Sequence, residues 1–186
     1  MARPARFTVD ELLDAAARLL AESGPAAVTM TAVARAAGAP SGSVYHRFSG
    51  RAELCAQLWL RTEQRFLAGF TAALTSSPDP RESCSAAALF VVRWCRGHPD
   101  EAQVLLAGAQ ALGAPDWPEP ARARHEQLLG ELRRALTSVP RDTERVTAAV
   151  IDIPYAIVRR HLLAGRGVPP GADAIVADCV RALIGA

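Results

Sequence analysis

Residues 29–54 read TMTAVARAAGAPSGSVYHRFSGRAEL, and this stretch decides the fold of the chain. It predicts a short helix over residues 29–37, a turn at Gly38, and a second helix over about residues 40–48. Because only a tight turn separates them, the two helices form a helix-turn-helix. Gly38 supplies the left-handed residue that the turn needs, and Gly42 gives the second helix room to approach its neighbour.

A clearly marked helix precedes this motif. Thr8 can cap it, Glu11 can complete a capping box, and Phe7 can pack on Leu12 across the first turn. Residues 24–25, a Gly-Pro pair, end this helix. The first 51 residues are therefore expected to form a three-helix domain.

The rest of the chain is also expected to be helical. Strand signals are nearly absent, and apolar residues recur at helical spacing between Pro and Gly breaks. The further helices are expected at residues 50–74, 79–96, 99–112, 118–136, 142–164 and 172–184. Within residues 142–164, Pro154 must kink or locally open the helix. The predicted fold is all-α with about nine helices, divided into a helix-turn-helix domain at residues 1–51 and a helical domain at residues 52–186.

The excess of positive charge lies in the N-terminal segment. The chain has 186 residues, with 21 basic and 19 acidic side chains and a net charge of +2. Residues 1–51 contain six arginines and four acidic residues, so this segment carries the whole excess. A surface that binds phosphates is therefore expected there.

Composition argues against several other classes of protein. The longest apolar run, residues 86–92, is far shorter than the roughly 20 residues that cross a bilayer, and no apolar signal-peptide core is visible. We therefore expect a cytoplasmic protein with no membrane partner, no metal and no cofactor. The cysteines lack metal-ligand spacing and are expected to be reduced core residues, with a redox-sensing thiol as the alternative. They are Cys55, Cys84, Cys95 and Cys179.

Residues 29–54 closely resemble the DNA-binding signature of the TetR family of one-component bacterial regulators, and the resemblance covers residues 8–55. The matching positions are Val33, Ala34, Ala37, Gly38, Gly42, Val44, Tyr45 and Phe48. Three positions depart from the pattern: Pro40 replaces a Ser or similar cap, Gly50 replaces a polar cap, and Arg51 replaces the common Lys. Pro suits a helix start and Arg holds phosphate at least as well as Lys, so these departures bear on the preferred operator, not on the fold.

The resemblance implies a role for each exposed position of the motif. The helix at residues 40–48 becomes the recognition helix in the major groove, with Ser41, Ser43 and His46 near base edges. The phosphate contacts of the family correspond to Thr29, Tyr45, His46 and Arg51. The predicted DNA-binding residues are therefore Thr29, Pro40, Ser41, Gly42, Ser43, Tyr45, His46 and Arg51.

Other roles are open for some of these residues. Ser41 and Ser43 can cap a helix instead of contacting DNA, and Tyr45 can pack in the core with only its hydroxyl exposed. Ahead of the first helix, Arg3 and Arg6 either reach the minor groove as a basic arm or serve solubility.

The resemblance also implies that the helices of residues 50–136 enclose an effector pocket and that the last two helices, at residues 142–164 and 172–184, pair with those of a second subunit. Their broad apolar faces agree with a homodimer interface. The candidate pocket residues are Trp59, Phe66, Phe70, Phe90, Trp94, Trp117, Asp152 and Tyr155. Plain core packing is the alternative for the aromatic residues. Asp152 either meets a cationic ligand or pairs with an arginine or a helix end.

The combined prediction is a regulator that binds a palindromic DNA operator as a homodimer and is released by a small apolar effector, with repression favoured over activation. The chain is not expected to be an enzyme, because it lacks a nucleophile elbow, a P-loop, a dinucleotide fingerprint and paired carboxylates near a histidine. A helix-bundle adaptor that binds only protein would explain the apolar helices but would leave residues 29–51 unexplained.

Overall fold

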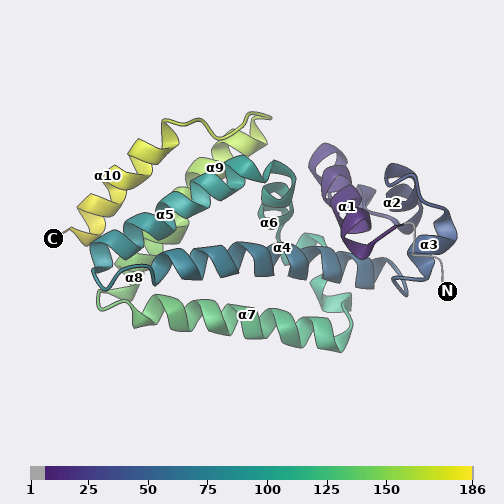
Figure 1. The fold of residues 1–186 in the computed structure, drawn as a ribbon, viewed down its shortest axis with the longest axis horizontal. Coiled ribbons are helices and arrows are strands. Elements are labelled where there is room, and N and C mark those ends of the chain that lie inside the picture. The colour runs from purple at the N-terminus through teal and green to yellow at the C-terminus, as the bar shows by residue number, and fades with distance from the viewer. Residues whose placement is uncertain (1–6, 186) are drawn as a thin grey trace, which may run out of the picture. The chain divides into compact units, whose positions relative to one another are not determined.

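The computed structural model describes residues 7–185, and Arg3 and Arg6 lie outside this range. Within it, helices and turns alone are present, so the predicted all-α fold is confirmed. The helices are α1 (Val9–Ser23), α2 (Met30–Ala36), α3 (Ser41–Tyr45), α4 (Arg51–Leu74), α5 (Pro80–Gly97), α6 (Pro99–Ala111), α7 (Glu119–Ser138), α8 (Thr143–Thr147), α9 (Ile153–Leu163) and α10 (Ala172–Ile184) (Figure 1). No helix of this part of the chain is long and apolar enough to cross a membrane.

The chain divides into two compact units. Unit 1 comprises Met1–Thr62 and Gln103–His125, and unit 2 comprises Glu63–Ala102 and Glu126–Ala186.

Unit 1 is built around α1 and the helix-turn-helix. The capping box predicted for α1 is confirmed, because the Thr8 N–H donates to Glu11 Oε2 (2.7 Å) and the Glu11 N–H donates to Thr8 Oγ1 (3.2 Å). The helix ends at Gly24, whose φ of +78° is in the left-handed region. The unit's core includes the fully buried residues Leu12, Val28, Val33, Val44, Phe48, Leu54, Leu58, Leu112 and Trp117.

Unit 2 is built around α5, which packs against α9 and α10 (Figure 1). Small side chains on α5 allow this close approach, and its buried residues include Cys84, Ala87, Ala88, Val92 and Cys95. The facing side of α10 buries Val176, Val180 and Ile184.

The helix predicted over residues 142–164 is interrupted where Pro154 requires it. Proline has no N–H to donate to the carbonyl four residues earlier, and the preceding turn, Ala148–Asp152, is π-helical. The helical stretch therefore divides into α8, this π turn and α9, so the predicted local opening is confirmed. When the stretch is taken as one interrupted helix, residues 7–185 contain nine helices, as predicted.

Candidate nucleic-acid interface

The helix-turn-helix consists of α2, a turn at Gly38 and α3. Thr29 caps α2 by accepting a hydrogen bond from the Ala32 N–H at its Oγ1 (3.2 Å). Gly38 has a φ of +64°, which explains why glycine suits this turn. Pro40 stands at the N-cap of α3. The motif therefore has the predicted order of cap, helix, turn and helix.

The second helix is shorter than predicted. Its hydrogen-bonded α-helical part ends at Tyr45, not near residue 48. The Arg47 and Phe48 N–H groups both donate to the Val44 carbonyl (3.0 Å each), so the last turn tightens before the chain leaves the helix. His46 and Arg47 consequently lie in the turn after α3.

Most of the predicted DNA-binding residues lie on one exposed segment. Pro40, Ser41, Gly42, Tyr45, His46 and Arg51 are exposed, whereas Thr29 and Ser43 are half-buried. The Tyr45 side chain is 57% exposed, which does not fit its alternative role in the core. Inside the motif, Val33 and Val44 are fully buried and attach α2 and α3 to the rest of unit 1.

Arg47 is an exposed residue of this segment that sequence reasoning did not single out. It follows Tyr45 and His46 directly and is one of the arginines that make the N-terminal segment basic. Its position in the sequence, next to these two predicted contacts, could have identified Arg47 as a candidate for phosphate binding.

Arg51, the first residue of α4, contacts backbone as well as solvent. Its Nε donates to the Val28 carbonyl (2.9 Å), and its Nη2 donates to the Pro25 carbonyl (3.0 Å). Beside it, the Ser49 N–H donates to Glu53 Oε2 (2.7 Å). The hydrogen bonds from Ser49, joined by one from Gln57, lower the pKa of Glu53, with burial acting in the opposite direction. Glu53 therefore satisfies a backbone donor just before the start of α4.

Arg61 joins α4 to α1. Its Nη1 donates to the Asp10 carbonyl (3.0 Å) and to Asp10 Oδ1 (3.1 Å), and its Nη2 lies 2.8 Å from Asp14 Oδ1. The Arg61 side chain is only 11% exposed, whereas both aspartates are more than half exposed. These charge-assisted contacts hold α1 and α4 in register within unit 1.

The predicted pocket residues of unit 1 form an aromatic cluster with His125. The Trp59 Nε1–H donates to His125 Nδ1 (3.3 Å), and the imidazole meets the rings of Trp59 and Trp117 edge to face. Trp59 and Trp117 are both buried. The hydrogen bond requires Nδ1 of His125 to be unprotonated.

The predicted pocket residues of unit 2 form a second cluster. Phe66 stands at its centre, with ring centroids 6.0 Å from Phe70, 5.7 Å from Phe90 and 5.1 Å from Trp94. Asp152 and Tyr155 are instead exposed on the π turn and on α9, and Tyr155 is 44% exposed.

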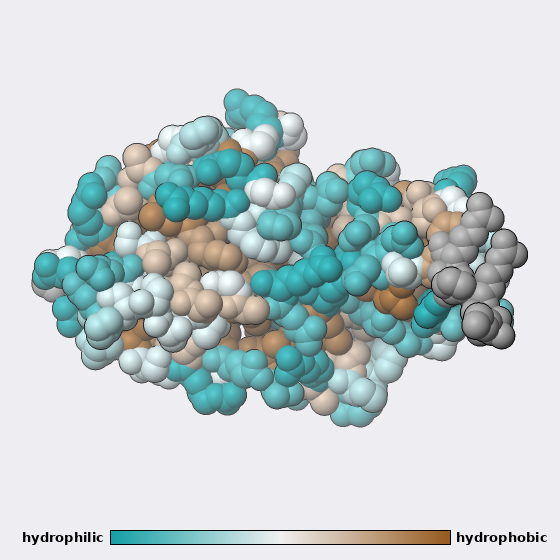
Figure 2. Space-filling view, viewed as in Figure 1, coloured by the Kyte–Doolittle hydropathy of each residue, from teal (hydrophilic) through white to brown (hydrophobic). Residues whose placement is uncertain are grey.

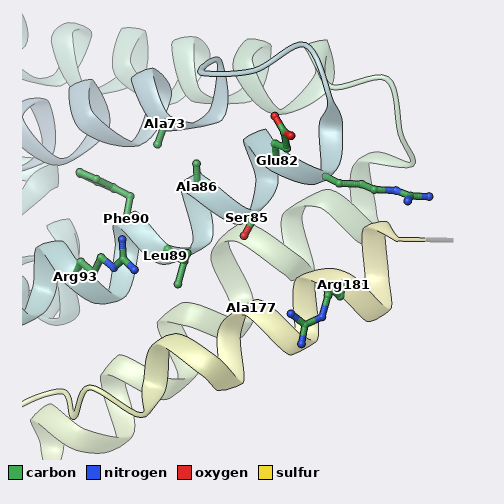
Figure 3. A pocket seen from close by; sticks show the side chains of 10 residues that line it. Ala73, Glu82, Ser85, Ala86, Leu89, Phe90, Arg93, Ala177 and Arg181 are labelled. Carbon is green, nitrogen blue, oxygen red and sulfur yellow. The ribbon is translucent and has the colours of Figure 1, made fainter.

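A groove of about 770 Å³ opens on unit 2 between the end of α4, α5 and α10 (Figure 3). Its apolar lining comprises Ala73, Ala86, Leu89, Phe90 and Ala177, and its polar lining comprises Arg81, Glu82, Ser85, Arg93 and Arg181. In the space-filling view, pale and brown residues gather over α4 and α5 on this unit (Figure 2). Two of the arginines have acidic partners: Arg93 Nε lies 2.8 Å from Asp173 Oδ2, and Arg181 pairs with Asp178. Phe90 is the only predicted pocket residue that lines this groove.

Residues 7–185 contain no group of three or more His, Cys, Asp or Glu side chains placed to hold a metal ion.

The helix-turn-helix also matches a known family. Residues 12–58 match the family model described as bacterial regulatory proteins, tetR family. These residues are similar to the N-terminal domain of TetR-family regulators. The predicted TetR resemblance is therefore confirmed for the helix-turn-helix segment.

Solved structures of transcription regulators share the fold over nearly the whole chain. A transcriptional regulator from Rhodococcus sp. Rha1 has a TM-score of 0.73 at 22% identity, covering 96% of this chain and 95% of that one. The ketosteroid transcriptional regulator KstR2 of Mycobacterium tuberculosis has a TM-score of 0.69 at 22% identity, covering 99% and 96%. FadR from Bacillus subtilis, solved with stearoyl-CoA, has a TM-score of 0.69 at 13% identity, covering 95% and 98%. No curated protein matches the chain.

Proposed function

We propose that this protein is a DNA-binding transcription regulator of the TetR type, a repressor that binds a palindromic operator as a homodimer and is released by a small apolar molecule. The observation that carries the proposal is the exposed segment of Tyr45, His46 and Arg47 at the end of α3, beside the fully buried Val44. A buried anchor next to uncovered polar and basic side chains is the arrangement that a recognition helix needs in the major groove.

In this proposal, residues 1–51 bind DNA and residues 52–186 sense the effector and dimerise. Ser41, Ser43 and His46 face base edges, and Thr29 and Tyr45 contact phosphates. The exposed start of α3, at Pro40 and Gly42, lets the backbone approach the groove.

The proposed dimer uses the last two helical stretches, residues 142–164 and 172–184. Among residues 7–185, four large hydrophobic side chains are exposed, and three of them lie on α9 or α10: Tyr155 (44%), Leu163 (63%) and Ile175 (49%). Exposed apolar side chains that gather on adjacent elements favour an interface. A two-fold dimer would present two recognition helices about 34 Å apart, one to each half of a palindrome.

The proposed effector is a small apolar molecule. Support comes from the aromatic clusters of Trp59 with Trp117 and of Phe66 with its neighbours, and from the apolar lining of the groove beside Phe90. Pockets for small molecules are mostly apolar with a few orienting polar groups. The solved neighbours include a regulator bound to stearoyl-CoA and one described as a ketosteroid regulator, and both compounds have a large apolar part, an acyl chain in one and a steroid skeleton in the other. Binding of such a molecule would shift the population of the dimer toward a spacing that does not fit the operator.

The DNA-binding proposal is tested by selecting bound duplexes from a random pool at moderate salt. Wild type is compared with Tyr45→Ala, which removes a side chain that is 57% exposed, and with Thr137→Ala on the exposed face of α7 as control. We expect wild type and the control to enrich one palindromic sequence and Tyr45→Ala to lose it. Enrichment of no sequence by wild type at any salt concentration would overturn the proposal and favour a protein-binding role.

A further inference from the structure

We propose that Arg51 acts on DNA binding as a positioning residue of the helix-turn-helix, through the backbone before α2, and not chiefly as a phosphate contact. The inference rests on the proposed function for its effect on DNA. Its structural half stands on unit 1 alone.

Both donors on one edge of the Arg51 guanidinium hydrogen-bond to protein backbone. Nε and Nη2 form the side-on edge of the guanidinium, and these two nitrogens donate to the carbonyls of Val28 (2.9 Å) and Pro25 (3.0 Å). The side-on edge is one of the geometries in which arginine grips a phosphate with two parallel hydrogen bonds. That grip requires Arg51 to release both carbonyls.

The two carbonyls stand at a point that decides where α2 begins. Pro25 opens the short 3₁₀ turn Pro25–Ala27, and Val28, whose side chain is fully buried, follows this turn. The next residue is Thr29, which caps α2 through its side chain and accepts the Val33 N–H at its carbonyl (2.9 Å). Arg51 therefore fixes the connector immediately before the first helix of the motif.

The other end of the motif is also tied to Arg51. The residue starts α4 and lies six positions after Tyr45, the last residue of α3. One side chain thus joins the entrance of α2 to the exit of α3. Lysine at this position would keep the positive charge but has a single nitrogen, which is a point donor that cannot reproduce the planar fork.

The first test is hydrogen exchange of the backbone amides of Ala32 and Val33, which report the cap of α2, in the absence of DNA. We expect Arg51→Lys to accelerate exchange at both amides about tenfold, because the hydrogen bonds from the charged guanidinium to the backbone just before Thr29 are lost. Arg35→Lys, a change at an exposed arginine of α2, is the matched control and is expected to leave exchange unchanged. Wild-type exchange rates in Arg51→Lys would overturn the proposal, whatever the protein does with DNA.

The second test is the salt dependence of affinity for the selected duplex, measured for wild type, Arg51→Lys and Arg51→Gln. A lost phosphate contact lowers the slope of log affinity against log salt by about 0.9, whereas a misplaced motif lowers affinity at every salt concentration. We expect both variants to bind about tenfold more weakly, with the wild-type slope retained in Arg51→Lys. Wild-type affinity in Arg51→Lys, together with a slope reduced by about 0.9 in Arg51→Gln, would overturn positioning in favour of a phosphate contact. If wild type binds no duplex, the proposed function fails, and the exchange experiment still decides the role of Arg51.

Discussion

The contact between Gly69 of α4 and Phe90 of α5 allows a stability prediction worked from distances. A Cβ added at Gly69 would lie 2.4 Å from both Cε2 and Cζ of Phe90, whereas ordinary contact begins at 3.4 Å. The ring, whose centroid lies 5.7 Å from that of Phe66, would therefore have to move by 3.4 − 2.4 = 1.0 Å. Such overpacking costs about 1–3 kcal/mol, and replacing a helical glycine with alanine returns about 1 kcal/mol.

Gly130 of α7 is a matched control for this change. It is also a helical glycine, but its added Cβ would meet only the flexible end of Arg134, at 3.5 Å. Gly130→Ala is therefore expected to stabilise the protein by about 0.5–1 kcal/mol. Gly69→Ala is expected to be less stable than Gly130→Ala by about 1–3 kcal/mol, the whole cost of moving the ring.

Urea unfolding followed by circular dichroism measures the free energy of unfolding of each variant. A Phe90→Ala background completes the cycle, because without the ring Gly69→Ala should stabilise the protein as Gly130→Ala does. The reasoning is refuted if Gly69→Ala alone stabilises the protein as much as Gly130→Ala.

Three further predictions concern the proposed dimer surface, an ion-pair network and the link between α1 and α4. Leu163→Glu places a charge on the exposed α9 surface and should halve the mass measured by light scattering, whereas Ala123→Glu on α7 should leave the mass unchanged. Equal masses of Leu163→Glu and wild type would contradict the proposed interface. Burial alone would raise the pKa of Asp173, but hydrogen bonds and charges from Arg96 and Arg93, its partners at 2.5 and 2.8 Å, bring this pKa below the usual value. The stability lost in Asp173→Asn should therefore be largest above about pH 5, where the unfolded carboxyl is also ionised, and should shrink as the pH falls through the lowered pKa. A loss that stays constant as the pH falls in urea unfolding would count against it. Arg61→Met keeps the apolar stem of this side chain, which is 11% exposed, but removes its hydrogen bonds and ion pairs. It should destabilise α1 by about 1–2 kcal/mol, measured as faster amide hydrogen exchange in α1. Unchanged exchange in α1 would show that the ion pairs contribute nothing to its stability.

Local signals explain why the secondary structure could be predicted from the sequence. The capping box of Thr8 and Glu11, the turn at Gly38 and the opening near Pro154 each depend on residues within a few positions of one another. The chemistry of those residues acts on the neighbouring backbone, so the sequence contains nearly all the information that decides each feature.

The contacts that join distant segments could not be predicted in the same way. The sequence predicts a phosphate contact for Arg51, but it does not predict the hydrogen bonds from its side-on edge to carbonyls that are 23 and 26 residues away in the chain. The close approach of Phe90 to Gly69 and the pairing of Arg61 with α1 likewise depend on how helices pack. Periodicity shows which face of a helix is buried, but it does not show which residue of another helix lies opposite.

The measurement that tests the central claim most directly is fluorescence anisotropy of the selected duplex and of a scrambled duplex of equal composition, titrated at several salt concentrations. A regulator that reads sequence through α3 should bind the selected duplex at least about 10³-fold more tightly than the scrambled one. Tyr45→Ala should lose most of that difference, and the affinity of wild type should fall steeply as salt rises. Equal affinity of wild type for both duplexes at every salt concentration would contradict the account.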